Sequence, residues 1–193
     1  MNKEDILIVC ALEKETQGQL DDYRVIYTGV GKVNAAITLT QYLQILEYEV
    51  SSPKKIKKII NFGTAGSRTL PIGHLAYCKK FIQRDMDKTA LGFKKGETAF
   101  EEDIPMMLNF GEGLVCGTGD NFVQDINKEL DVIDVFDMEA YALAKVCWMY
   151  ELPFTSYKYI TDNANEKSAK DWESNLADGV KEFKLKILDN GPL

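Results

Sequence analysis

Three carboxylates stand out in this sequence, because each closely follows an apolar run that is typical of a buried strand. They are Glu15, Glu139 and Asp162. The chain has a single histidine, His74, so carboxylates must carry most of the proton transfer if the protein is an enzyme. An acid or base that is held in position accelerates a reaction roughly 10²–10⁴-fold, and the three side chains are therefore the first candidates for catalysis.

Each carboxylate also has a purely structural interpretation. Glu15 can be a solvated residue in the first turn of a helix, and Glu139 can be favoured at a helix start by the helix dipole. Asp162 precedes 163–165 (Asn-Ala-Asn), where an N-cap or an Asx-turn would use its side chain. Phe122 is more typical of a core than of a surface that stacks on a base. Together, however, three carboxylates and an aromatic ring at one edge of a sheet favour a functional site.

Two glycine-rich segments lie beside these residues. The segment 29–31 (Gly-Val-Gly) lacks the third glycine and the acidic residue of a dinucleotide fingerprint, so it is either a tight turn or a ligand contact through Val30. In 63–66 (Gly-Thr-Ala-Gly), small neighbours would let the Thr64 hydroxyl approach a sugar or a water closely.

The elements that must position these residues alternate between strand-like and helix-like patterns. Short apolar runs rich in β-branched residues predict strands, and apolar residues at helical spacing predict helices. Expected strands are 6–10, 24–27, 56–62, 73–82, 114–117, 132–136 and 154–160, and expected helices are 32–48, 138–150 and 172–188. Such alternation predicts an α/β fold in which helices cover both faces of a sheet, with ligands at the carboxyl ends of the strands. The length of 193 residues favours a single domain over 1–193.

Charge and hydropathy exclude several classes of partner. The 23 basic residues are outnumbered by 30 acidic ones, which makes a poor surface for nucleic acid, and the basic run 54–58 lacks interleaved aromatic residues. No stretch approaches the roughly 20 apolar residues of a membrane span. The first apolar run follows Glu4 and Asp5 rather than a basic stretch, so we expect no signal peptide.

The cysteines and the histidine bear on compartment and cofactors. Four widely separated cysteines form no C-x-x-C pair, and we expect them to be reduced in a cytoplasmic protein; they are Cys10, Cys78, Cys116 and Cys147. A single histidine argues against a histidine-ligated zinc site. We therefore expect no metal and no cofactor.

In their order along the chain, these pieces resemble the purine nucleoside phosphorylase/nucleosidase superfamily, and most closely its methylthioadenosine/S-adenosylhomocysteine nucleosidases. The resemblance spans nearly the whole chain and is carried by segments 11–15, 29–36, 61–66, 85–93, 117–122, 137–140 and 160–162. It implies a three-layer α/β/α sandwich with a central mixed, largely parallel sheet. The implied reaction is cleavage of the bond between a purine and ribose.

The resemblance also implies a role for each site residue. Glu15 would deprotonate the attacking water, and Asp162 would deliver a proton to purine N7. Glu139 and Met138 would hold the ribose, while Phe122 would stack on the base. The remaining contacts implied near the substrate are Val30, Thr64 and Leu91, the last in a stretch that would lie near the interface of a homodimer.

The nucleophile is expected to be water. Related phosphorylases bind phosphate with arginines after the first strand and before the glycine turn of the third, where this chain has 13–15 (Glu-Lys-Glu) and 59–62 (Ile-Ile-Asn-Phe). Arg68 and Arg84 keep a phosphate-dependent phosphorylase open as an alternative.

The identity of the substrate is less constrained than the reaction. The segment 16–23 is too short for the extra hairpin of typical nucleosidases, which bears on the 5′ side of the pocket. Open alternatives are a nucleosidase of the AMP or futalosine type and a relative that binds nucleosides without turnover.

Overall fold

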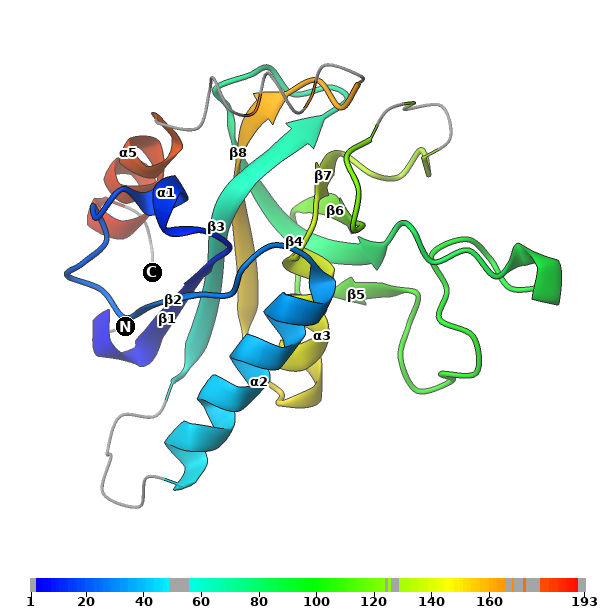
Figure 1. Ribbon diagram of the computed structural model, residues 1–193, viewed down its shortest axis with the longest axis horizontal. Helices are drawn as coiled ribbons and strands as arrows, with labels where there is room; N and C mark the ends of the chain where they lie inside the picture. Colours follow the sequence, from blue (N-terminus) through cyan, green and yellow to red (C-terminus); the bar gives the residue numbers. More distant parts are fainter. Residues whose placement is uncertain are drawn as a thin grey trace.

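A mixed β-sheet with helices packed on it forms the fold of the computed structural model (Figure 1), which describes residues 3–48, 56–123, 125, 129–165, 168, 172 and 178–190. The strands are β1 (Ile6–Cys10), β2 (Val25–Tyr27), β3 (Lys58–Ser67), β4 (Leu75–Gln83), β5 (Met107–Asn109), β6 (Leu114–Thr118), β7 (Val135–Asp137) and β8 (Phe154–Asp162). The helices are α1 (Glu13–Thr16), α2 (Lys32–Tyr48), α3 (Ala140–Met149) and α5 (Gly179–Phe183), and α5 continues in a wider turn over Lys184–Asp189. Short 3₁₀ turns cover Lys3–Asp5 and Thr89–Leu91.

The strand pairings confirm a mixed, largely parallel sheet. Among the described residues, five of the eight pairings are parallel: β1–β2, β1–β3, β3–β8, β4–β6 and β6–β7. The antiparallel ones are β3–β7, β4–β5 and β4–β8. Because β3, β8, β4, β6 and β7 pair in succession and β7 returns to β3, this part of the sheet closes into a ring, which the sequence did not predict.

Two long strands, β3 and β8, form the spine of this sheet. They pair in parallel from Ile59 opposite Phe154 to Gly66 opposite Asp162, and all nine residues of β8 are buried. Polar side chains within them are paired: Asn61 donates to the Val9 carbonyl at 2.9 Å. Both strands run past the ends expected at 62 and 160, so 63–66 belongs to β3 and is not a loop after it.

Residues of β1 alternate between two cores, as a strand buried on both faces requires. Leu7 and Val9 pack in a cluster with side chains of α2 and α3, whereas Ile6 and Ile8 pack in a second cluster with Phe183 of α5. Figure 1 shows the corresponding arrangement, with α2 and α3 on one side of β1 and β3 and with α1 and α5 on the other. Helices on both sides leave the carboxyl ends of these strands as the open edge.

Several expected elements differ in their bounds. The helix 32–48 is confirmed as α2, whereas the strand expected at 132–136 is the shorter β7 and the helix expected from 138 begins at Ala140. The sequence did not predict α1 or β5. Of the closing helix expected over 172–188, the part 173–177 lies outside the described residues.

The cysteines and the hydropathy of the helices were both subjects of sequence predictions. All four cysteines are buried and free of disulfide bonds. Over the described ranges of the chain, no helix combines the length and hydropathy that crossing a membrane would need.

Candidate active site

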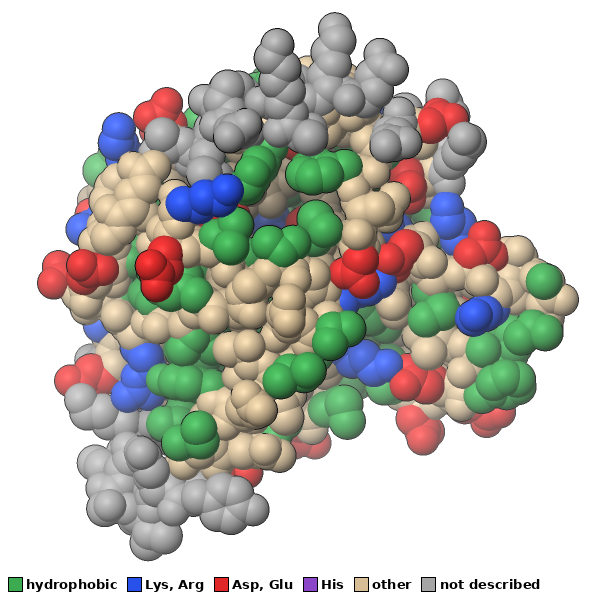
Figure 2. Space-filling view, viewed as in Figure 1, with side chains coloured by type: hydrophobic (Ala, Val, Ile, Leu, Met, Phe, Trp, Pro, Cys, Tyr) green, Lys and Arg blue, Asp and Glu red, His purple; other side chains and the backbone are tan. Residues whose placement is uncertain are grey.

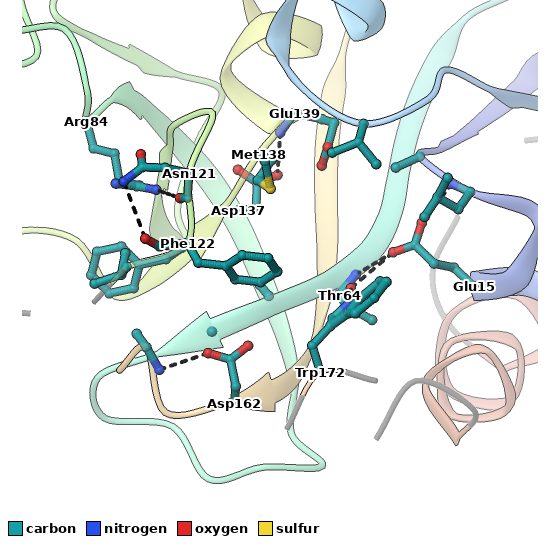
Figure 3. A pocket seen from close by; sticks show the side chains of 18 residues that line it. Glu15, Thr64, Arg84, Asn121, Phe122, Asp137, Met138, Glu139, Asp162 and Trp172 are labelled. Atoms are coloured by element: carbon teal, nitrogen blue, oxygen red, sulfur yellow. Dashed lines mark hydrogen bonds between the residues drawn. The ribbon is translucent and has the colours of Figure 1, made fainter. Parts of the chain in front are cut away.

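A cavity of about 220 Å³ opens at the carboxyl ends of β1, β3 and β8. Figure 2 shows it as a hollow bordered by hydrophobic side chains, and Figure 3 shows the residues that line it. Seven of the eight expected site residues are among them: Glu15, Val30, Thr64, Phe122, Met138, Glu139 and Asp162. The exception is Leu91, which lies in the turn Thr89–Leu91 with 65% of its surface exposed and does not line the cavity.

Glu15 is held by three hydrogen bonds at one side of the cavity. Its Oε1 accepts from both the backbone N–H and the hydroxyl of Thr64, each at 3.1 Å, and its Oε2 accepts from the Leu12 N–H at 3.0 Å. The last bond is the local capping contact of α1, so Glu15 is a first-turn glutamate as expected, but it is buried and the interpretation of a solvated residue is wrong. The same carboxylate lines the cavity and is fixed in one orientation.

Glu139 approaches the cavity from the start of α3. Its Oε1 accepts the N–H of Gly31 at 2.9 Å. Gly29 and Gly31 both adopt positive φ, so 29–31 is the tight turn that was one of its two interpretations, and Val30 at its tip also lines the cavity. Burial, reinforced by repulsion from Asp137, raises the pKa of Glu139 to about 7.

A buried ion pair lies beneath these two carboxylates. The Lys158 Nζ is 2.8 Å from Asp137 Oδ2, and both side chains are about 1% exposed. Burial opposes the lysine charge, but attraction by Asp137 and Glu139 outweighs it and raises the pKa of Lys158. Burial likewise opposes ionisation of Asp137, but the lysine charge outweighs it and lowers the pKa of that carboxyl. Both groups are therefore charged at neutral pH.

Gly63 brings this lysine close to Glu15. A Cβ built on Gly63 would lie 3.3 Å from Glu15 Oε1 and 3.4 Å from Lys158 Nζ, so both polar atoms reach into the space that a side chain would fill. Lys158 was not predicted from the sequence as a residue of the site. The signal in the sequence was a lysine in the middle of a run of apolar and uncharged polar residues that predicts a buried strand. A lysine is rarely buried without a partner of opposite charge.

Asp162 ends β8 at the opposite side of the cavity. Its Oδ1 accepts the N–H of Ala164 at 2.9 Å, so the expected Asx-turn forms, and its Oδ2 accepts from Thr161 at 3.2 Å. A Cβ on Gly66 would lie only 2.4 Å from Oδ1, so glycine is the residue that leaves room for this carboxyl. Figure 3 shows Asp162 separated from Glu15 by the width of the cavity.

Apolar side chains form the remaining walls. Phe122 is 42% exposed and lines the cavity, so it does not occupy the core position that is usual for a phenylalanine. Trp172 also lines the cavity and donates its indole N–H to Thr64 Oγ1 at 2.7 Å. Trp172 was not among the site residues expected from the sequence, yet its polar edge bonds to one of them.

The geometry can be compared with known proteins. Residues 10–114 match the family described as the Phosphorylase superfamily. The chain belongs to the Phosphorylase superfamily.

Curated members of this superfamily align over most of their length. A 5′-methylthioadenosine/S-adenosylhomocysteine nucleosidase of Shewanella piezotolerans is 33% identical over 183 residues, which cover 81% of this chain and 76% of the relative. The enzyme of the same name from Bacillus thuringiensis is 31% identical, covering 79% of this chain and 74% of the relative.

Solved structures of two other proteins share the fold. The S-adenosylhomocysteine nucleosidase of Streptococcus pyogenes, in complex with 5-methylthiotubericidin, superposes with a TM-score of 0.78 at 22% identity, covering 97% of each chain. The futalosine hydrolase of Helicobacter pylori superposes with a TM-score of 0.77 at 19% identity, covering 91% of this chain and 92% of the other. The mixed α/β fold is thereby confirmed.

The two arginines that kept a phosphorylase open as an alternative, Arg68 and Arg84, both pair with carboxylates. Arg84 lines the cavity, but its guanidinium is buried, pairs with Glu129 at 3.1 Å and donates to the Asn121 carbonyl. Arg68 pairs with Asp131 at 3.0 Å and does not line the cavity. Glu15, Glu139 and Asp162 line the same cavity, and carboxylates repel a dianion such as phosphate.

Proposed function

We propose that this protein hydrolyses the N-glycosidic bond of an adenine nucleoside, such as methylthioadenosine or S-adenosylhomocysteine, and releases the free base. The observation that carries the proposal is the set of three carboxylates, Glu15, Glu139 and Asp162, around one cavity with Phe122 on its wall. The curated nucleosidases at 31–33% identity support the same reaction.

Asp162 is the general acid of the proposed mechanism. Adenine leaves readily only after protonation, and Asp162, which is buried beside Phe122, would donate to N7 while the ring stacks on the base. The Ala164 N–H and the Thr161 hydroxyl hold the carboxyl at this edge. A proton on the leaving base avoids the expulsion of an anion into a buried site.

Glu139 and Met138 act on the ribose. With its Oε1 fixed by the Gly31 N–H, Glu139 would accept hydrogen bonds from ribose hydroxyls and stabilise the positive charge that develops on the sugar as the base departs. Met138 lines the cavity beside it and would pack on the ring.

Glu15 activates the nucleophile. Three of the roughly four acceptor positions of its carboxylate are taken by Thr64 and Leu12, which leaves a position on Oε2 for a water. That water would attack the sugar as Glu15 removes its proton. An acid on the leaving group and a base on a water, at opposite sides of the site, follow the logic of inverting glycosidases.

Water is favoured over phosphate as the nucleophile. The position that a dianion would occupy is next to Glu15, and the Arg84 guanidinium is already bound to Glu129 and the Asn121 carbonyl. A carboxylate repels phosphate, whereas it accepts a proton from water.

The active form is proposed to be a cytoplasmic homodimer. Leu91 is exposed away from its own cavity, and Val33 and Ile37 expose apolar surface on α2, which Figure 2 shows as hydrophobic side chains along this helix. The proposal is that a second copy covers this face and that Leu91 of the partner subunit closes the 5′ side of the pocket. Four buried free cysteines suit a reducing compartment.

Release of adenine tests the function directly. Methylthioadenosine, S-adenosylhomocysteine, adenosine and AMP are each incubated with the protein, with and without phosphate, and adenine is quantified by chromatography. We expect release that is independent of phosphate and at least about 100-fold slower in Asp162→Asn. Strict dependence on phosphate would indicate a phosphorylase, and tight binding without product would indicate a nucleoside-binding protein.

A further inference from the structure

Trp172 connects the two segments on which the orientation of Glu15 depends. Its indole N–H donates to Thr64 Oγ1, near the carboxyl end of β3. Its ring lies under the Lys14 ammonium, 4.1 Å from the ring centroid, and Lys14 precedes Glu15 in α1. Figure 3 shows Trp172, Thr64 and Glu15 side by side on one wall of the cavity.

The chemistry of the two donors gives this contact a direction. An indole N–H can only donate, so the Thr64 hydroxyl must accept from Trp172 and its own proton is left to donate elsewhere. Glu15 Oε1 lies 3.1 Å from the same hydroxyl oxygen and can only accept when ionised. The chain of bonds therefore runs from Trp172 through Thr64 to Glu15, with each proton assigned.

We infer that Trp172 is a positioning residue for the water-activating carboxylate, because its indole N–H fixes the Thr64 hydroxyl as a donor to Glu15. The inference rests on the proposed function and deepens it. Without the indole N–H, the hydroxyl is free to rotate and donate to other acceptors, and Glu15 Oε1 keeps only the Thr64 backbone N–H. The Glu15 carboxylate is then less often in the orientation in which its Oε2 faces the attacking water.

A set of variants distinguishes a role of Trp172 in orienting Glu15 from a role in lining the cavity. Trp172→Phe keeps an aromatic ring on the wall of the cavity and removes the indole N–H. Thr64→Val removes the hydroxyl at nearly constant volume, and Thr64→Ser keeps it. Trp148→Phe is the matched control, since Trp148 of α3 packs edge-on against Phe110 and does not line the cavity.

The kinetic outcome is a split between kcat and KM, measured by adenine release from methylthioadenosine. We expect Trp172→Phe to lower kcat about 3- to 10-fold, as for loss of one ordering hydrogen bond, with KM within about twofold and an unchanged melting temperature. In the Thr64→Ser background the same loss persists, whereas in the Thr64→Val background Trp172→Phe changes kcat by less than about twofold. Trp148→Phe leaves both constants unchanged.

Two results would overturn the inference. One is a higher KM with unchanged kcat in Trp172→Phe, which would make the indole only a wall of the pocket. The other is an equal loss of kcat with and without the Thr64 hydroxyl. Failure of the proposed function is distinct, because the wild-type protein would then release no adenine.

Fluorescence tests the hydrogen bond itself and needs no turnover. The sequence has two tryptophans, so Trp172 is the sole tryptophan in Trp148→Phe, and excitation at a wavelength that tyrosine does not absorb selects its emission. We expect Thr64→Val in that background to shift the Trp172 emission to shorter wavelength, because the indole loses its acceptor, and Thr64→Ser to leave it in place. Identical emission in the Val and Ser variants would contradict the bond.

Discussion

Replacing Glu139 by glutamine should make the protein more stable at alkaline pH while it abolishes most of the activity. The amide keeps an oxygen that can accept the Gly31 N–H and has nearly the same volume, so the change removes little but the charge. In the wild-type protein that charge is buried and lies near Asp137, which raises the pKa of Glu139 to about 7. The folded protein therefore disfavours the ionised form.

The size of the effect follows from linkage. A carboxyl whose pKa rises from 4.5 in the unfolded chain to about 7 on folding contributes no penalty below pH 4.5, because it is protonated in both states. Stability is lost as the pH rises from 4.5 through 7, by about 3 kcal/mol in total at roughly 1.4 kcal/mol per unit. For a chain of this size, that difference corresponds to roughly 6–12 °C in melting temperature.

Thermal melts at intervals between pH 5 and pH 8.5 measure this dependence. We expect the melting temperature of Glu139→Gln to exceed that of the wild type by an amount that grows with pH and levels off above pH 8. Glu112→Gln is the control, because Glu112 is fully exposed and should give parallel curves. If Glu139→Gln also runs parallel to the wild type, the buried charge does not destabilise the fold and the reasoning is refuted.

Three further outcomes follow from the same site. Lys158→Met should destabilise the protein by about 3–5 kcal/mol in urea unfolding at pH 7, because it leaves Asp137 buried and unpaired. The control Lys186→Met removes a lysine from an exposed pair with Glu182 and should cost less than about 1 kcal/mol. Gly66→Ala should lower kcat at least about 10-fold, because its Cβ would displace the Asp162 carboxyl; an unchanged kcat would contradict this crowding. The kcat/KM profile should rise with pH through about 7, as Glu139 ionises, and this limb should be absent in Glu139→Gln.

The positions of two of the three carboxylates were predictable because they depend on local patterns. Glu15 and Asp162 lie at the carboxyl ends of β1 and β8, and both strands run parallel to β3, so they end at one edge of the sheet. Glu139 follows β7, which is antiparallel to β3, and it reaches the same cavity only because the sheet closes. The tight turn at 29–31 was predictable for the same reason, since its glycines are needed for positive φ.

Other features depend on contacts between distant segments, which local patterns do not specify. The ring of strands arises because β8 pairs with β4 as well as β3, and the pairing of β3 with β7 completes it. Lys158 and Asp137 are 21 positions apart and become partners only through that sheet. Trp172 has the spacing of a core residue, and its role depends on a hydroxyl more than a hundred positions earlier. Leu91 was expected by resemblance and lies outside the cavity of its own chain.

In the proposed mechanism, the charges around the cavity link the expected destabilisation of the fold by Glu139 to its role in the reaction. The charge of Lys158 is largely neutralised by Asp137, so it stabilises the nearby carboxylate of Glu139 only in part. Repulsion between Glu15 and Glu139 then adds to the free energy of the empty pocket. A ribosyl cation brings the missing positive charge when the base departs. The repulsion present in the empty pocket is then relieved in the transition state and not in the ground state, which is the condition for raising kcat. Glu139→Gln should accordingly lower kcat far more than it raises KM for methylthioadenosine, while the folded protein becomes more stable.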